Sequence, residues 1–204
     1  MSVGGRSQVG AFGTSAEGAT GVSCRWAVFL SGRGSTAQAL FDVIDQIDVR
    51  WVVSSRASAL GLKRAARCGL PTTVLASPID WQGLDQELQQ RRIEKIFLLG
   101  FMRLLPAEFV RSWRGRIWNV HPSLLPAFPG AHAMEKSFQA GAPMGVTIHD
   151  VNEEMDAGVR RRQAQAQPCV AWEEMQLRMA ISEQRLIRDW AAAVNFRGWR
   201  SEWC

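Results

Sequence analysis

The chain has 204 residues, of which 47% are hydrophobic and 21% charged, a composition typical of one globular domain. No uninterrupted apolar run approaches the roughly 20 residues that a membrane-spanning helix needs, so a membrane partner is not expected. The net charge is +5, but the arginines are spread along the chain without a recognition motif, so nucleic acid is not an expected partner either.

The first 23 residues are rich in glycine, serine and alanine and have no repeating pattern. We expect residues 1–23 to form a flexible extension and residues 24–204 to form one domain. The extension lacks the apolar core of a secretory signal, and the four cysteines follow no metal-binding spacing. Both features favour a cytoplasmic protein with reduced thiols.

Short apolar runs alternate along the chain with segments of helical periodicity. The first run, residues 25–30, leads into a glycine-rich turn, after which apolar residues recur at helical spacing from Ala37 to Ile44. Further strands are expected at 49–54, 72–75, 95–99, 116–120 and 145–151, helices at 57–68, 84–92, 106–113 and 132–140, and a long final helix with an apolar stripe from Met175 to Val194. This alternation predicts an α/β fold, with a mostly parallel central sheet and helices on both faces.

The turn SGRGST, residues 31–36, lies between an expected strand and an expected helix. Backbone N–H groups and the positive end of a helix dipole at such a turn favour a phosphate, and Gly32 and Gly34 allow the backbone to approach it. The turn has neither the lysine of a Walker loop nor the third glycine of a dinucleotide-binding fingerprint. On these residues alone, a phosphate site and a simple tight turn both remain open.

Asn119 and His121 lie where a strand is expected to end, and ligands of open parallel sheets bind at the carboxyl ends of strands. Side chains alternate along a strand, so these two share a face. An amide that stabilises an oxyanion and an imidazole that moves a proton suit acyl transfer. Asp156, in the acidic loop 152–158, would stabilise the protonated imidazole if that loop folded back. The alternative is a polar strand end followed by a solvated acidic turn, and His149 is expected to be structural.

Several segments, in this order, resemble the folate-dependent formyltransferases. They are SGRGS at 31–35, LGFMRLL at 99–105, NVHPSLLP at 119–126, FPG at 128–130, GVTIH at 145–149 and DAG at 156–158. The resemblance extends from about residue 25 to about residue 190, and it is strongest to the branch that formylates glycinamide ribonucleotide in purine biosynthesis. It implies a Rossmann-like formyltransferase fold, of which this chain is a divergent member.

The resemblance also implies the substrates and their contacts. The formyl donor would be 10-formyltetrahydrofolate and the acceptor the amine of glycinamide ribonucleotide, and the reaction would need no metal ion. The sequence does not specify an oligomeric state. Catalytic roles are implied for Asn119, His121 and Asp156. Implied contacts are with the substrate phosphate for Gly34, Ser35 and Thr36, with the ribonucleotide for Glu183, and with the folate for Met102, Arg103, Leu104 and Leu105.

The chain departs from the family pattern at four places. Thr36 replaces an asparagine, Gln82 stands near a basic position, and the final helix has EQRLIR from residue 183 in place of Glu-His-x-x-Tyr-Pro. Three arginines at 160–162 replace an apolar strand, and because they cannot all be buried without partners, we expect an exposed edge or a local departure from the family fold. Two alternatives therefore stay open: a formyltransferase for another amine, such as an amino sugar nucleotide, and a non-catalytic homologue that binds folate or phosphate.

Overall fold

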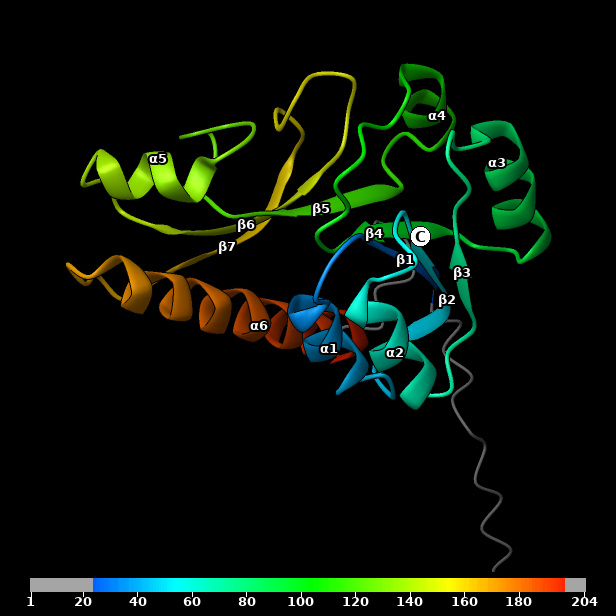
Figure 1. Ribbon diagram of the computed structural model, residues 1–204, viewed down its shortest axis with the longest axis horizontal. Helices are drawn as coiled ribbons and strands as arrows, with labels where there is room; N and C mark the ends of the chain where they lie inside the picture. The colour runs from blue at the N-terminus through cyan, green and yellow to red at the C-terminus, as the bar shows by residue number, and fades with distance from the viewer. Residues whose placement is uncertain (1–23, 197–204) are drawn as a thin grey trace, which may run out of the picture.

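A seven-stranded sheet organises residues 24–196, the part of the chain that the computed structural model describes (Figure 1). Its spatial order is β3-β2-β1-β4-β5-β6-β7. The strands are β1 (Arg25–Leu30), β2 (Asp48–Ser54), β3 (Thr72–Val74), β4 (Lys95–Leu98), β5 (Ile117–His121), β6 (Gly145–Asp150) and β7 (Arg160–Gln165). The first five pair in parallel, whereas β6 pairs antiparallel with both of its neighbours, β5 and β7. The predicted mostly parallel sheet is confirmed; the expected extension, residues 1–23, lies outside the described residues.

Helices cover both faces of the sheet, as predicted (Figure 1). They are α1 (Ser35–Phe41), α2 (Leu60–Arg67), α3 (Trp81–Gln90), α4 (Ala107–Ser112), α5 (Ala133–Gln139) and α6 (Trp172–Phe196). One apolar core joins the sheet to α1 and α6, and a second joins the opposite face to α3 and α4. No helix between residues 24 and 196 is both long enough and apolar enough to span a membrane.

Two helices begin at residues other than those that periodicity predicts. α3 begins at Trp81, three residues earlier than expected, because the Asp80 side chain accepts a hydrogen bond from the Gly83 N–H at 2.9 Å. α2 begins at Leu60, later than expected, and no side chain caps it. The apolar pattern therefore identifies both helices, and at α3 the Asp80 cap determines where the helix starts.

The arginine-rich segment forms β7, at one edge of the sheet, so the expected edge position is confirmed. The β6–β7 register shifts between Ile148 and His149, which places an additional residue on β7. Arg161 lies at this bulge and donates from Nε and Nη2 to the carboxylate of Asp150, at 2.8 and 2.5 Å. Arg162 bonds a carbonyl of α6 and Arg160 is exposed. The strand thus ends the sheet without a buried unpaired charge.

The cysteines only partly follow the expectation of reduced thiols. Cys68 and Cys169 are free, whereas Cys24 is disulfide-bonded, so the expectation is wrong for Cys24. Spacing along the chain could not reveal this, because disulfide formation depends on the distance between cysteines in the fold.

Candidate active site

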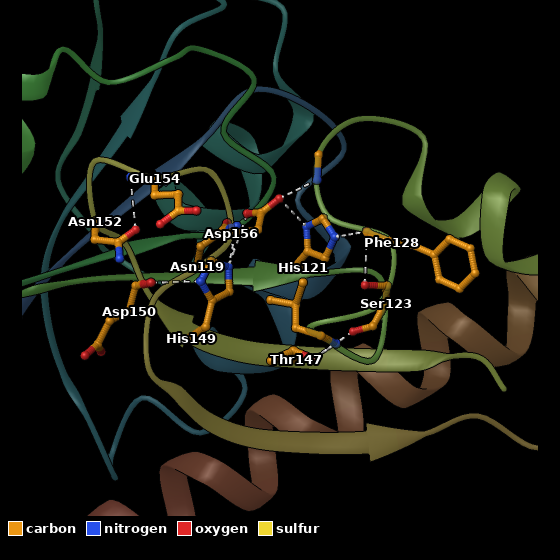
Figure 2. A network of polar contacts seen from close by, with 12 residues as sticks. Asn119, His121, Ser123, Phe128, Thr147, His149, Asp150, Asn152, Glu154 and Asp156 are labelled. Carbon is orange, nitrogen blue, oxygen red and sulfur yellow. Dashed lines mark hydrogen bonds and ion pairs between the residues drawn. The ribbon is translucent and has the colours of Figure 1, made fainter. Parts of the chain in front are cut away.

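Asn119 and His121 lie at the carboxyl end of β5, next to the antiparallel strand β6. Asn119 stands opposite His149 in the ladder, and His121 stands opposite Thr147. Both side chains project toward the loop that carries Asp156, as strand alternation predicts (Figure 2). The structure therefore brings together the three residues for which catalytic roles were expected.

The imidazole of His121 is buried between two oxygen atoms (Figure 2). Its Nε2–H donates to the Phe128 carbonyl at 2.9 Å, and its Nδ1 lies 3.3 Å from Asp156 Oδ2. A doubly protonated ring donates to both oxygens, whereas a neutral ring turns a lone pair toward one of them. Proton exchange between Nε2 and a ligand requires that ligand to displace the Phe128 carbonyl.

Asp156 lies on a loop that folds back over the end of the sheet. Its backbone has φ of 53°, a left-handed conformation that aspartate tolerates better than most residues. Asp156 Oδ2 also accepts the Gly130 N–H at 2.7 Å, which fixes the carboxylate beside His121. The fold-back depends on Gly158, because a Cβ there would lie 1.8 Å from the carbonyl oxygen of Asp150.

His149 orients the amide of Asn119. Its Nδ1–H donates to the Asp150 carbonyl at 2.8 Å, and burial lowers its pKa, so the ring is neutral and Nε2 is an acceptor. Asn119 Nδ2 donates to this Nε2 at 3.2 Å, which leaves the second amide hydrogen for a ligand. His149 was expected to be structural, and its contact with Asn119 was missed. The signal that identifies it is the antiparallel pairing of β5 with β6.

The loop after His121 is held by hydrogen bonds to β6 and β7. Thr147 Oγ1 donates to the Ser123 carbonyl at 2.7 Å and accepts the Leu125 N–H at 3.1 Å. Gln163 Nε2 donates to the Leu125 carbonyl at 2.8 Å. These bonds fix the path of the loop, and with it the Phe128 carbonyl that contacts His121.

The glycine-rich turn packs directly against α2. The Gly61 N–H donates to the Gly32 carbonyl at 3.2 Å, and Arg64 Nε donates to the Arg33 carbonyl at 3.0 Å. Gly34 has φ of 68° and precedes α1, whose first N–H groups have no acceptor within the helix. Two of the turn's carbonyls, those of Gly32 and Arg33, are thus bonded to α2, while donors of the first turn of α1 remain for a ligand.

Replacing Gly34 by alanine is expected to lower the free energy of unfolding by about 2–5 kcal/mol. A Cβ at Gly34 would lie 2.5 Å from the Cα of Gly61. The alanine backbone would also have to adopt the left-handed conformation that Gly34 has, with φ of 68°. The sequence left a phosphate site and a simple tight turn open, and the structure shows that the packing of α2 requires Gly34 in either case. Urea unfolding of Gly34→Ala measures the loss, and Gly32→Ala, whose Cβ meets nothing within 4 Å, is the control. Equal stability of the two variants would contradict this explanation.

Glu183 connects α6 to the glycine-rich turn. Thr36 Oγ1 donates to Glu183 Oε2 at 2.7 Å, so two residues for which ribonucleotide contacts were expected touch each other. Burial raises the pKa of Glu183, and the hydrogen bond from Thr36 only partly opposes this. The carboxylate is therefore held at a position that is unfavourable for its charge, as at many binding sites.

Replacing Glu183 by glutamine is expected to raise the melting temperature near pH 7. A raised pKa in the folded state means that ionisation costs stability as pH rises through that pKa, and glutamine has no such cost. The gain should shrink toward pH 4.5, the ordinary pKa of glutamate, where the wild-type group is protonated. Thermal unfolding across this pH range measures it, with the exposed Glu173→Gln as a control that gains nothing. A gain in melting temperature that does not depend on pH would contradict the raised pKa of Glu183.

The residues expected to contact folate lie in the loop between β4 and α4. Met102 and Leu104 are exposed, whereas Leu105 packs in the core, so its side chain is not available to a ligand. Arg103 and Leu104 line a cavity of about 190 Å³ together with Ser55 and Trp81. No group of three or more histidine, cysteine or acidic side chains in residues 24–196 is arranged to hold a metal ion.

The sequence is similar to a known family and to several purine-biosynthesis proteins. A family model described as formyl transferase matches residues 24–187. The chain is 43% identical over 148 residues to the trifunctional purine biosynthetic protein adenosine-3 of Drosophila pseudoobscura pseudoobscura, covering 66% of this chain and 11% of that protein. It is 37% identical over 142 residues to phosphoribosylglycinamide formyltransferase of Escherichia coli, covering 64% of this chain and 67% of that protein. The chain thus spans only a small part of its trifunctional relatives.

Solved structures agree with the sequence matches. The structure of glycinamide ribonucleotide transformylase 1 from Geobacillus kaustophilus has a TM-score of 0.78 at 33% identity, covering 85% of this chain and 99% of that one. The phosphoribosylglycinamide formyltransferase structure from Anaplasma phagocytophilum has a TM-score of 0.77 at 33% identity, covering 84% and 88%. The predicted Rossmann-like formyltransferase fold is confirmed by these neighbours.

Proposed function

The chain belongs to the formyl transferase family, and from this we propose that it transfers the formyl group of 10-formyltetrahydrofolate to the amine of glycinamide ribonucleotide, a step of purine biosynthesis. The observation that supports this most strongly is the convergence of Asn119, His121 and Asp156 at the carboxyl end of β5. It combines an oriented amide donor with a histidine beside a carboxylate, as acyl transfer needs.

In the proposed reaction, the amine nitrogen attacks the formyl carbon, and the carbonyl oxygen becomes an oxyanion. Asn119, held by His149 through one amide hydrogen, donates the other to this oxyanion. Asp156 stabilises the protonated ring of His121. The substrate displaces the Phe128 carbonyl from His121 Nε2. As the bond from the formyl carbon to the folate nitrogen breaks, His121 then carries the proton lost by the amine through Nε2 to that leaving nitrogen.

The binding assignments follow the same proposal. Gly34, Ser35 and Thr36 receive the substrate phosphate, and Glu183, bonded to Thr36, contacts the ribonucleotide. The loop that contains Met102, Arg103, Leu104 and Leu105 contacts the folate, and the Arg103 guanidinium beside the cavity suits a carboxylate.

The proposal also covers the setting of the reaction. Residues 24–204 form the formyltransferase domain, which acts in the cytoplasm on water-soluble metabolites. The reaction takes place without a metal ion, nucleic acid or membrane, because an amide, an imidazole and a carboxylate supply all the groups that the chemistry uses.

A comparison of acceptors tests the proposal. The purified protein is incubated with 10-formyltetrahydrofolate and either glycinamide ribonucleotide or an amino sugar nucleotide, and products are identified by mass spectrometry. We expect formylation of the ribonucleotide only. Formylation of the sugar nucleotide alone would assign the chain to another branch, and binding of both substrates without product would identify a non-catalytic homologue.

A further inference from the structure

Ser31 is the first residue of the glycine-rich turn, but its side chain belongs to a different contact. The side chain is buried, with the residue 2% exposed. Its Oγ accepts the Met102 N–H at 2.8 Å and lies 2.6 Å from Ser55 Oγ. Its backbone N–H donates to the Gly100 carbonyl at 3.0 Å. Ser31 therefore contacts the loop between β4 and α4 twice, through its backbone and its hydroxyl.

The middle of that loop has little apolar packing of its own. Met102 and Leu104 are 70% and 82% exposed. Packing holds the loop on both sides of Met102, where the Phe101 ring lies 5.4 Å from the ring of Phe29 and Leu105 is buried in the core. The hydrogen bond to Ser31 is thus a principal determinant of the backbone position at Met102.

The direction of the bond between the two serine hydroxyls follows from the available hydrogens. If Ser31 donates to Ser55, the buried Ser31 hydroxyl hydrogen has an acceptor, and the Ser55 hydrogen remains for the cavity that Ser55 lines. In the opposite direction Ser31 Oγ would accept twice, and its own hydrogen would need another acceptor in a buried place. Buried hydroxyls are costly without a partner, so the first direction is favoured.

We propose that Ser31 is a positioning residue for the formyl donor, and that Ser55 donates a hydrogen bond to a carbonyl or carboxylate oxygen of that donor in the cavity beside Arg103. Ser31 thus acts on the folate loop although it begins the turn assigned to the ribonucleotide phosphate. This inference rests on the proposed function, since it takes the folate loop and the cavity as the donor site.

Ser31→Ala tests the inference through a difference between the two substrates. The KM for 10-formyltetrahydrofolate should rise about three- to tenfold, the effect of one hydrogen bond, and the KM for the ribonucleotide should stay within about twofold. The Met102 amide hydrogen should also exchange faster with solvent. Thr36→Val should show the opposite selectivity, because Thr36 contacts Glu183. Ser137→Ala removes an equally buried hydroxyl from α5 and should change neither KM.

The outcomes separate this inference from the proposed function. Equal changes of both KM values, or an unchanged Met102 exchange rate, would overturn the role of Ser31. If Ser31→Ala does not fold, Ser55→Ala should raise the donor KM while leaving Met102 protected; an unchanged donor KM would overturn the inference. If the wild-type protein shows no turnover, the proposed function fails. In that case, calorimetry of tetrahydrofolate binding to the wild-type protein and to Ser31→Ala tests whether Ser31 positions the folate loop. Equal affinities would overturn that role.

Discussion

Replacing Asn119 by alanine is expected to lower kcat by about 10²–10³-fold, with the KM values little changed. Alanine removes the amide hydrogen that faces the ligand, and with it the only donor that we assign to the oxyanion. The neighbouring His149 then loses its hydrogen bond from Asn119 but stays buried and bonded to the Asp150 carbonyl. Steady-state kinetics with glycinamide ribonucleotide measure the loss, and circular dichroism confirms that the fold is retained.

Asn119→Asp separates the amide's hydrogen bonds from its shape. Aspartate has the same size, but the oxygen that replaces Nδ2 faces both the oxyanion and the acceptor nitrogen of His149 and has no hydrogen to donate to either. We therefore expect Asn119→Asp to be at least as impaired as Asn119→Ala. Near-normal kcat in either variant would remove Asn119 from the mechanism.

Replacing Asp156 by asparagine is expected to lower kcat by about 10²–10⁴-fold. Asparagine retains an oxygen that can accept the Gly130 N–H, so the loop keeps its position, but the charge beside His121 Nδ1 is lost. Without that charge the protonated ring is less stable, and proton transfer to the leaving nitrogen slows. Steady-state kinetics of the wild-type protein and of Asp156→Asn, measured at the same pH, give the ratio of the two kcat values.

Glu154→Gln is the matched control for Asp156→Asn. It makes the same change of charge in the same loop, but Glu154 is exposed and two residues from Asp156. Its kcat should stay within about twofold of wild type. Equal losses of kcat in the two variants would show that the net charge of the loop determines activity, and that the contact between Asp156 and His121 does not.

Much of this site follows from local sequence rules. Alternation along a strand places Asn119 and His121 on one face, and the structure agrees. The alternation of strands and helices predicts the parallel strands of the sheet, and with them the edge, at the strands' carboxyl ends, at which these residues lie. The acidic loop folds back as expected, and Gly158 is the residue that permits it.

Other features depend on contacts between segments that are distant in the chain. His149 contacts Asn119 only because β6 runs antiparallel to β5, a direction that the alternating pattern does not reveal. The position of Arg161 depends on a bulge in the register of β7 with β6. Ser31 lies inside the motif assigned to phosphate, and its contact with Met102 becomes visible only when β1 and β4 are adjacent. Sequence patterns predict elements, whereas these contacts depend on strand order and register.

A single-turnover experiment tests the central claim most directly. Enzyme in excess is mixed with 10-formyltetrahydrofolate that carries an isotope-labelled formyl group and with glycinamide ribonucleotide, and the label is followed by rapid quench. We expect the wild-type protein to move the label completely to the ribonucleotide amine. We expect Asn119→Ala to bind both substrates with near-normal affinity and to move the label about 10²–10³-fold more slowly. Label that stays on the folate in the wild-type protein, or that moves at the same rate in Asn119→Ala, would contradict this account.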